Sequence, residues 1–225
     1  MSMAISIPGT KRGFVITVDG PSAAGKGTLA RRLAAHFGFD FLDTGALYRG
    51  VGLAVLRQGL DPADEKAATA AAGALKPEIL ADPAIRAENT STAASKVAAI
   101  PSVRAAILNW QRDFARDAAS NSGGAVLDGR DIGTVVCPDA DAKLFITASV
   151  QARAERRVKE LQARGETAIY ARVLQDMQER DARDQGRSIS PTKPATDALI
   201  IDTSDLTADQ VFERALAFIA SKMKA

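Results

Sequence analysis

The sequence has very little cysteine and histidine, and this scarcity excludes several classes of site. A single cysteine, Cys137, cannot form an internal disulfide or a multi-cysteine zinc or iron–sulfur site. A single histidine, His36, argues against a Ser/His triad and a multi-histidine metal site. Since His36 falls in a predicted amphipathic helix, we expect a surface or packing residue. Chemistry in this chain must therefore depend mainly on lysine, arginine, aspartate and the backbone.

An excess of charge of one sign is also lacking, as are long apolar runs. The 29 basic and 27 acidic residues leave a formal net charge of +2, and aromatic residues make up only 5% of the chain. With no basic stripe carrying interleaved rings, we expect no nucleic-acid partner. No apolar run reaches the roughly 20 residues that span a bilayer, and residues 1–13 lack the apolar segment of a signal peptide. We therefore expect a cytoplasmic protein with no membrane partner, and a monomer.

What is present is an alternation of short apolar runs with helical patterns. The chain has 225 residues, 46% of them hydrophobic, which is enough for one sizeable core. The predicted strands are 14–18, 39–42, 125–128, 143–147 and 198–201, with a further short strand at 78–80. The predicted helices are 28–37, 46–57, 67–75, 101–119, 150–164, 167–183 and 207–222. Strands separated by helices predict an α/β fold with a parallel sheet covered on both faces.

A glycine-rich loop follows the first predicted strand and begins the first helix. Its residues are Gly20, Pro21, Ser22, Ala23, Ala24, Gly25, Lys26, Gly27 and Thr28. Glycines allow a tight turn in which successive N–H groups converge on phosphate oxygens, and the helix N-terminus adds partial positive charge. Lys26 supplies a full charge for the β- and γ-phosphates, although Gly27 stands where the strict motif has Ser or Thr. The loop predicts a nucleotide-phosphate site.

Charged residues follow a later strand. Asp128 ends the strand at 125–128, a position that suits a Mg²⁺ site and equally a simple turn cap. Arg130 and Asp131, flanked by glycines, come directly after it and fall at the ligand edge of an open α/β sheet. This run favours a functional site over a turn cap.

Residues 151–187 contain eight arginines and one lysine. Arginine suits a planar, two-bonded grip on phosphate, so a basic helical hairpin here could close over a nucleotide as a lid. Taken alone, the same pattern also fits a solvated helix face with surface ion pairs. Together with the phosphate loop it favours a kinase over a hydrolase, because phosphoryl transfer needs alignment and charge neutralisation with little proton traffic.

Several segments resemble the bacterial cytidylate kinases, a branch of the nucleoside monophosphate kinases. Gly-Lys-Gly-Thr is the usual form of the loop in those enzymes, which accounts for Gly27. The other matching segments are 42–49, 128–136 and 179–184, with a weaker match at 93–95 and 100–104. Together they span residue 14 to about residue 202, which is most of the chain.

The resemblance implies a three-layer P-loop kinase fold with a parallel sheet, a short NMP-binding insert and a helical lid. All of residues 1–225 would form a single domain. Its core would comprise about 13–58, 101–150 and 195–225, its insert about 59–100, and its lid about 151–194. The family usually carries a longer insert with a small sheet of its own, so the closing motion here is expected to differ.

The resemblance also implies roles for particular residues. ATP, the phosphoryl donor, would be bound by the glycine-rich loop and Arg157, with Mg²⁺ held by Thr28 and Asp128, directly or through water. CMP or dCMP, the acceptor, would be contacted by Thr44, Arg49, Ser95, Arg104, Arg130, Asp131, Arg180, Asp184 and Arg187. Of these, Arg49, Arg130 and Arg187 would surround the acceptor phosphate, Arg180 and Asp184 would contact the sugar, and Ser95, Arg104, Asp131 and Thr44 would line the base pocket. The catalytic residues would be Lys26, Arg130, Asp131 and Arg187.

The chemistry of cytosine agrees with the expected base pocket. Cytosine presents an amino donor at N4 beside acceptors at N3 and O2, so a carboxylate suits the first and a guanidinium the others. Uracil places an acceptor where the amino group was and would face Asp131 unfavourably. Discrimination by an unmatched buried polar group can be large.

Three alternatives stay open at this point. Another small-molecule P-loop kinase could act on UMP or on a phosphate-free alcohol, although three arginines aimed at the acceptor argue against an uncharged one. A nucleotide-binding regulator or GTPase-like switch is disfavoured because the sequence has no Asn-Lys-x-Asp motif. A nucleic-acid-binding module is the least supported, for the reasons of composition given above.

Overall fold

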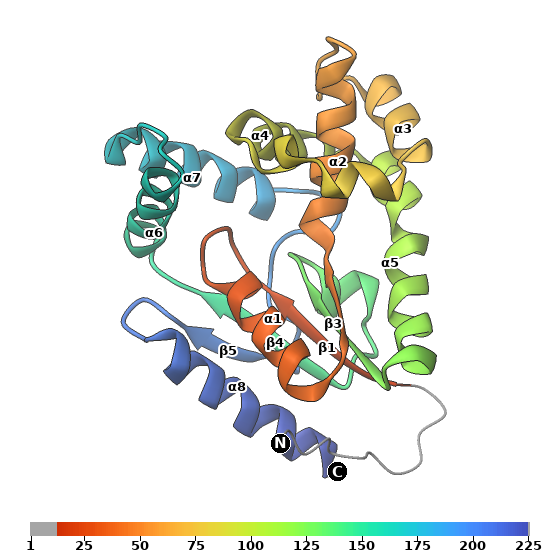
Figure 1. The fold of residues 1–225 in the computed structure, drawn as a ribbon, viewed down its shortest axis with the longest axis vertical. Helices are drawn as coiled ribbons and strands as arrows, with labels where there is room; N and C mark the ends of the chain where they lie inside the picture. Colours follow the sequence, from red (N-terminus) through yellow and green to blue (C-terminus); the bar gives the residue numbers. More distant parts are fainter. Residues whose placement is uncertain (1–12, 225) are drawn as a thin grey trace.

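The computed structural model describes residues 13–224. Residues 1–12, most of the stretch expected to lack a signal peptide, lie outside the described residues. Within residues 13–224, five parallel strands form one sheet in the order β2-β3-β1-β4-β5 (Figure 1). The strands are β1 Phe14–Asp19, β2 Asp40–Asp43, β3 Gly124–Asp128, β4 Ala142–Thr147 and β5 Leu199–Asp202. The prediction of a parallel sheet is confirmed. The carboxyl ends of its five strands lie along one edge of the sheet.

Two helical layers cover the sheet and confirm the three-layer α/β fold. Helices α1 (Lys26–Phe37) and α8 (Ala208–Met223) pack on one face through a hydrophobic cluster that includes Ile16 and Val18. Helix α5 (Pro101–Asn121) and the short turn η3 (Ile132–Val136) pack on the other face. Because side chains alternate along a strand, Val126 belongs to the first cluster while its two neighbours belong to the second.

The segment between β2 and α5 is helical throughout. It contains α2 (Thr44–Arg57), α3 (Glu65–Gly73) and α4 (Glu88–Val97), which share a hydrophobic cluster with the start of α5. The prediction of a strand at 78–80 was wrong, since these residues lie in the 3₁₀ turn η1 (Pro77–Ala81), followed by η2 (Pro83–Arg86). Pro77 and Pro83 each begin one of these turns, because the proline ring fixes φ near the helical value.

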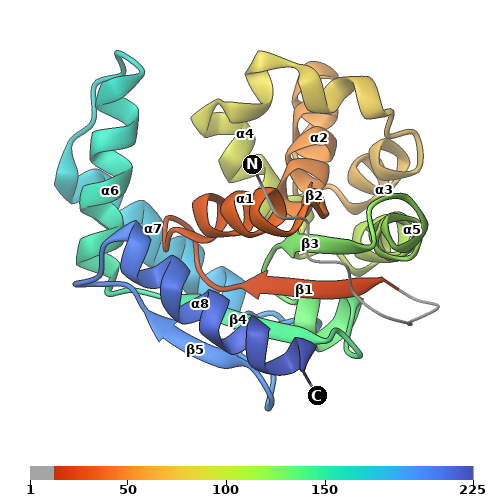
Figure 2. The same cartoon turned by 60° about the horizontal axis from the view of Figure 1, so that its bottom comes forward.

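Helices α6 (Val150–Ala163) and α7 (Tyr170–Gln185) form the predicted hairpin and have a small hydrophobic cluster of their own. The two views show this hairpin and the α2–α4 group on either side of the loop that precedes α1 (Figures 1 and 2). Across the described residues, none of the helices has the length and apolarity that crossing a membrane requires.

The two rare residues lie in ordinary surroundings. His36 is exposed on α1, where its ring meets Phe212 edge-on with a centroid separation of 5.7 Å, which confirms the prediction of a surface or packing residue. Cys137 is half-buried, and burial raises the pKa of its thiol to about 11. A thiol with this pKa stays protonated near neutral pH and is a weak nucleophile.

Candidate active site

The phosphate loop turns from β1 into α1 through left-handed backbone. Gly20, Ala23 and Gly25 have φ values of 139°, 57° and 94°. A Cβ on Gly20 would lie 1.9 Å from the carbonyl oxygen of Ile146, so only glycine fits at the start of the loop. Gly25 is the N-cap of α1, and the first helical turn therefore opens directly from the loop. The backbone has the form that phosphate binding by N–H groups requires.

Lys26 is the buried cation of this loop. Its side chain is 5% exposed, and Nζ donates a hydrogen bond of 2.7 Å to the carbonyl oxygen of Pro21. Burial, followed by the nearby charge of Arg130, lowers the pKa of Lys26 to about 7, although Asp128 and Asp19 oppose the shift. A phosphate beside Nζ would restore the charge of the ammonium group.

Asp128 and Thr28 lie next to this loop. Burial raises the pKa of Asp128, and its Oδ2 would be 3.2 Å from a Cβ on residue 27, so Gly27 leaves room for the carboxylate. Thr28 is exposed on the first turn of α1. Between residues 13 and 224 no group of three histidine, cysteine, aspartate or glutamate side chains could hold a metal ion. One carboxylate and one hydroxyl fit Mg²⁺ that arrives with nucleotide phosphates, which supply most of its ligands.

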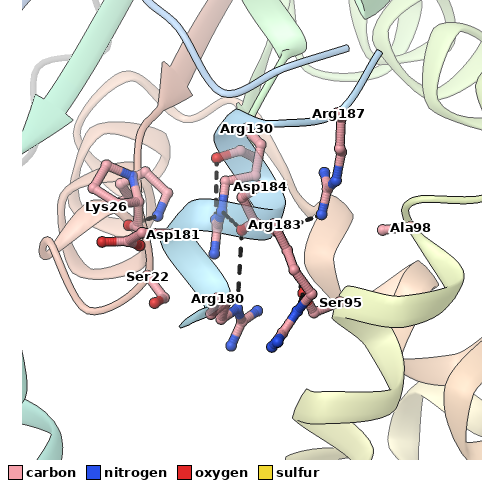
Figure 3. Close-up of polar contacts among 12 residues, drawn as sticks. Ser22, Lys26, Ser95, Ala98, Arg130, Arg180, Asp181, Arg183, Asp184 and Arg187 are labelled. Atoms are coloured by element: carbon pink, nitrogen blue, oxygen red, sulfur yellow. Dashed lines mark hydrogen bonds and ion pairs between the residues drawn. The ribbon is translucent and has the colours of Figure 1, made fainter. Parts of the chain in front are cut away.

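Opposite the loop, Asp184 on α7 is a buried carboxylate at the centre of a cluster of half-buried arginines. Its Oδ2 lies 3.3 Å from Nε of Arg130 and 3.9 Å from Nε of Arg180, while Oδ1 pairs with Arg187. The hydroxyl of Ser95, on α4, lies 3.4 Å from the same Oδ1. Figure 3 shows Lys26 on one side of Arg130 and Asp184, with Ser95 and Arg187 on the other. The structure thus brings together residues that are far apart in the sequence.

This cluster carries more positive charge than its carboxylate neutralises. Burial opposes ionisation of Asp184, but Arg130, Arg187 and Arg180 together outweigh it and lower the pKa of the carboxyl. Burial, and then Arg130, lowers the pKa of Arg180 to about 10. In the described part of the chain, the buried Nε atoms of Arg49, Arg180 and Arg187 have no hydrogen-bond partner. Buried donors of this kind are normally satisfied, so the arrangement suits an anionic ligand.

A second buried pair lies beside the cluster. Arg104, from the first turn of α5, forms an ion pair with Asp131, and its Nη1 donates 3.2 Å to the carbonyl oxygen of Ala98. The guanidinium also lies over the ring of Tyr48, 5.4 Å from its centroid. Thr44 is buried nearby and donates 2.7 Å to the carbonyl oxygen of Asp128. This pair places a hydrogen-bond donor, the guanidinium, beside a hydrogen-bond acceptor, the carboxylate.

Two of the predicted arginines form pairs outside the Asp184 cluster. Arg49 pairs with Asp43 at 2.7 Å, at the end of β2. Arg157, expected to bind ATP, instead pairs with Glu88 on α4 and with Glu160 at 2.7 Å on its own helix. It therefore joins the α6–α7 hairpin to the α2–α4 group, and its role toward ATP stays a prediction.

Four residues that contribute to this region were not predicted from the sequence. Arg153 is buried on α6, and its guanidinium bonds to Asp181 on α7 at 2.5 Å and to the carbonyl oxygen of Ser22 at 3.3 Å. Asp43 fixes Arg49, and Asp19 ends β1 directly before Gly20. Asp19 and Asp43 each end a strand, as Asp128 does, so their positions could have identified them. Nothing in the sequence distinguished Arg153 and Asp181 from the other charged residues of the hairpin.

Comparison with solved structures agrees on the fold alone. An uncharacterized protein from Eubacterium ventriosum superposes with a TM-score of 0.53 at 15% identity, covering 93% of this chain and 99% of that one. A sugar kinase from Janibacter sp. superposes with a TM-score of 0.50 at 16% identity, covering 92% of this chain and 95% of that one.

Sequence comparison is far more specific. A cytidylate kinase from Paramagnetospirillum magneticum is 60% identical over 208 residues, which are 92% of this chain and 98% of the relative. A cytidylate kinase from Rhodospirillum rubrum is 55% identical over 209 residues, which are 93% of this chain and 98% of the relative. The family model for cytidylate kinase matches residues 16–221, and the chain therefore belongs to the cytidylate kinase family.

Proposed function

We propose that this enzyme transfers the γ-phosphoryl group of ATP to CMP and dCMP, giving CDP or dCDP and ADP. The observation that carries the proposal is the arginine cluster around the buried Asp184, which faces the phosphate loop and adjoins the Arg104–Asp131 pair. One phosphate site formed by backbone and a second formed by arginines are what transfer between two nucleotides needs. Membership of the family supports the same reaction.

On the donor side, the loop N–H groups and Lys26 hold the ATP phosphates. Thr28 and Asp128 would hold Mg²⁺, directly or through water, and the ion would neutralise charge on the phosphates. Arg157 contacts ATP after exchanging its carboxylate partners for phosphate oxygens, a step that its position on the hairpin allows. These groups stabilise the negative charge of the transition state without taking part in covalent chemistry.

On the acceptor side, Arg49, Arg130 and Arg187 surround the CMP phosphate, while Arg180 and Asp184 contact the sugar. An oxygen of the acceptor phosphate attacks the γ-phosphorus in line, the bond to the bridging oxygen breaks, and ADP leaves. Alignment by the arginines replaces the proton transfers that histidine would perform in a hydrolase.

The base pocket is formed by Thr44, Ser95, Arg104 and Asp131. The Asp131 carboxylate accepts a hydrogen bond from the N4 amino group of cytosine, and the Arg104 guanidinium donates to N3 and O2. Uracil would place an acceptor against Asp131, leaving a buried polar group without a partner.

Closure completes the site. The insert at about 59–100 and the lid at about 151–194 meet over the core and exclude water that would hydrolyse ATP. We also infer that the enzyme works as a monomer, and we place it in the cytoplasm, where its substrates are.

The test is a coupled assay that measures ADP formation with AMP, GMP, UMP, CMP and dCMP as acceptors. CMP is expected to have the highest kcat/KM, and ATP turnover should depend on its presence. Preference for AMP or for an acceptor without phosphate would contradict the proposal, and acceptor-independent turnover would favour a hydrolytic switch.

A further inference from the structure

A buried carboxylate outside the assigned site joins the phosphate loop to the base pocket. Asp19 is the last residue of β1, and its side chain is on the sheet face covered by η3. Its Oδ1 accepts 2.8 Å from the N–H of Ile132, and its Oδ2 accepts 2.7 Å from the N–H of Gly133. Each oxygen of this carboxylate therefore holds one backbone donor of the segment 131–136.

The same segment is packed tightly against β1. A Cβ on Gly133 would lie 2.8 Å from Oγ1 of Thr17 and 3.2 Å from Cδ of Lys143. Thr17 is two residues before Asp19, so both side chains are on one face of the strand. The segment thus has two attachments to β1, one by hydrogen bonds and one by close contact. Since Ile132 and Gly133 directly follow Asp131, these attachments fix the backbone from which Asp131 reaches Arg104.

The other side of Asp19 is equally constrained. The next residue is Gly20, where the phosphate loop begins against the carbonyl oxygen of Ile146. Burial raises the pKa of Asp19 to about 7, while its two N–H donors oppose that rise. A buried carboxyl is unfavourable unless it is hydrogen-bonded, so its presence at this junction calls for a specific use of both acceptors.

We propose that Asp19 is a positioning residue that holds the segment 131–136 in the register needed for Asp131 and Arg130 to meet the acceptor nucleotide. The inference rests on the proposed function, because it assigns Asp19 an effect on CMP recognition. Asp19 itself touches neither nucleotide. Its replacement should affect the acceptor side of the reaction more than the donor side, although it adjoins the phosphate loop in sequence.

The test compares Asp19→Asn with a matched control on the same strand. Asn has the same shape but presents an amide donor to one of the two N–H groups, so one attachment is lost. Asp141 accepts 2.8 Å from the N–H of Val15 at the opposite end of β1, which makes Asp141→Asn the control for loss of a carboxylate that binds the strand backbone. Steady-state KM for CMP and ATP, the ratio of kcat/KM for CMP over UMP, and Tm would be measured for both variants and the wild type.

For Asp19→Asn we expect KM for CMP to rise about tenfold and the CMP over UMP ratio to fall several-fold, with KM for ATP changed by no more than about twofold. Asp141→Asn should lower Tm without altering that ratio. A lowered Tm with an unchanged ratio for Asp19→Asn would show a purely structural role and overturn the inference. If the wild type itself shows no CMP preference, the proposed function fails and the inference fails with it.

Gly133→Ala displaces the same segment while leaving Asp19 intact, and it decides the matter if Asp19→Asn does not fold. Its methyl group would force the segment away from Thr17, so the ratio of kcat/KM for CMP over UMP should fall, as it does for Asp19→Asn. The rise in KM for CMP should again exceed the rise in KM for ATP. An unchanged ratio in folded Gly133→Ala protein would contradict the positioning of Asp131 by these attachments.

Discussion

The proposed donor and acceptor sides of the site are built from different parts of the chain, one from backbone and one from side chains. The donor side is one continuous stretch, residues 20–28, whose shape depends on glycine φ values and a buried lysine. The acceptor side is assembled from side chains of α2, α4, α5, α7 and the segment after β3, held by ion pairs with Asp43, Asp131 and Asp184. A site formed by backbone N–H groups has one shape, and few substitutions preserve it. Arginines that are paired with carboxylates can exchange those partners for a ligand.

The largest effect should come from the donor side. Lys26→Met removes the only buried cation of the phosphate loop, so kcat is expected to fall by about 10³-fold. Binding of CMP, measured by calorimetry, should stay nearly unchanged because the arginine cluster is intact. Comparable loss of CMP binding would show that the two sides are not separable.

The largest effect on stability should come from the buried ion pair between Arg153 and Asp181, which lies between the two sides. Asp181→Asn leaves Arg153 buried without its carboxylate, and breaking a buried pair in this way costs about 3 kcal/mol. Because Arg153 also donates to the carbonyl oxygen of Ser22, KM for ATP should rise as well. Urea denaturation and steady-state kinetics measure the two effects. The exposed pair Arg116–Asp113 supplies a control, since Asp113→Asn should change neither.

The pKa of Lys26 gives the donor side a pH dependence. With a pKa of about 7, the side chain is charged below that pH and mostly neutral at pH 8, and bound phosphate raises the pKa again. Binding of a non-transferable ATP analogue with Mg²⁺ at pH 8 should therefore take up about one proton. Its affinity should weaken by up to about tenfold per pH unit above pH 7.

Calorimetry in buffers of different ionisation enthalpy measures this uptake. Lys26→Arg is the control, because a guanidinium stays charged and should show none of it. Equal uptake by both proteins would place the proton on another group.

The smallest effect should come from the ion pair between Arg157 and Glu88. Half of the Glu88 side chain is exposed, so Glu88→Gln should change stability by less than about 1 kcal/mol. If Arg157 exchanges Glu88 for ATP, the same variant should lower KM for ATP by about twofold. Glu160→Gln, which removes the other partner, tests whether the effect belongs to the contact between hairpin and insert. A raised KM in Glu88→Gln alone would show that the pair instead supports ATP binding.

The same contrast explains what could be predicted from the sequence. The strand, loop and helix around residues 20–28 were predicted correctly because they are consecutive and each has a strong local signal, while phosphate binding by this loop stays a prediction. The acceptor side could be assigned only through the family resemblance, since Ser95 and Asp184 are 89 residues apart and meet by tertiary packing. The 3₁₀ turn that begins at Pro77 stands where a strand was predicted at 78–80, because two apolar residues after Glu78 are too few to show a periodicity. Arg153 and Asp181 were not predicted because α6 and α7 are both rich in charged residues, and the sequence does not indicate which of these residues form a buried pair.

The central claim is that the acceptor is selected by the buried Arg104–Asp131 pair. The most direct measurement is the ratio of kcat/KM for CMP over UMP in the wild type and in Asp131→Asn, at constant ATP. We predict a large ratio in the wild type and a markedly smaller one in the variant, with KM for ATP unchanged. An unchanged ratio in a folded variant would contradict it.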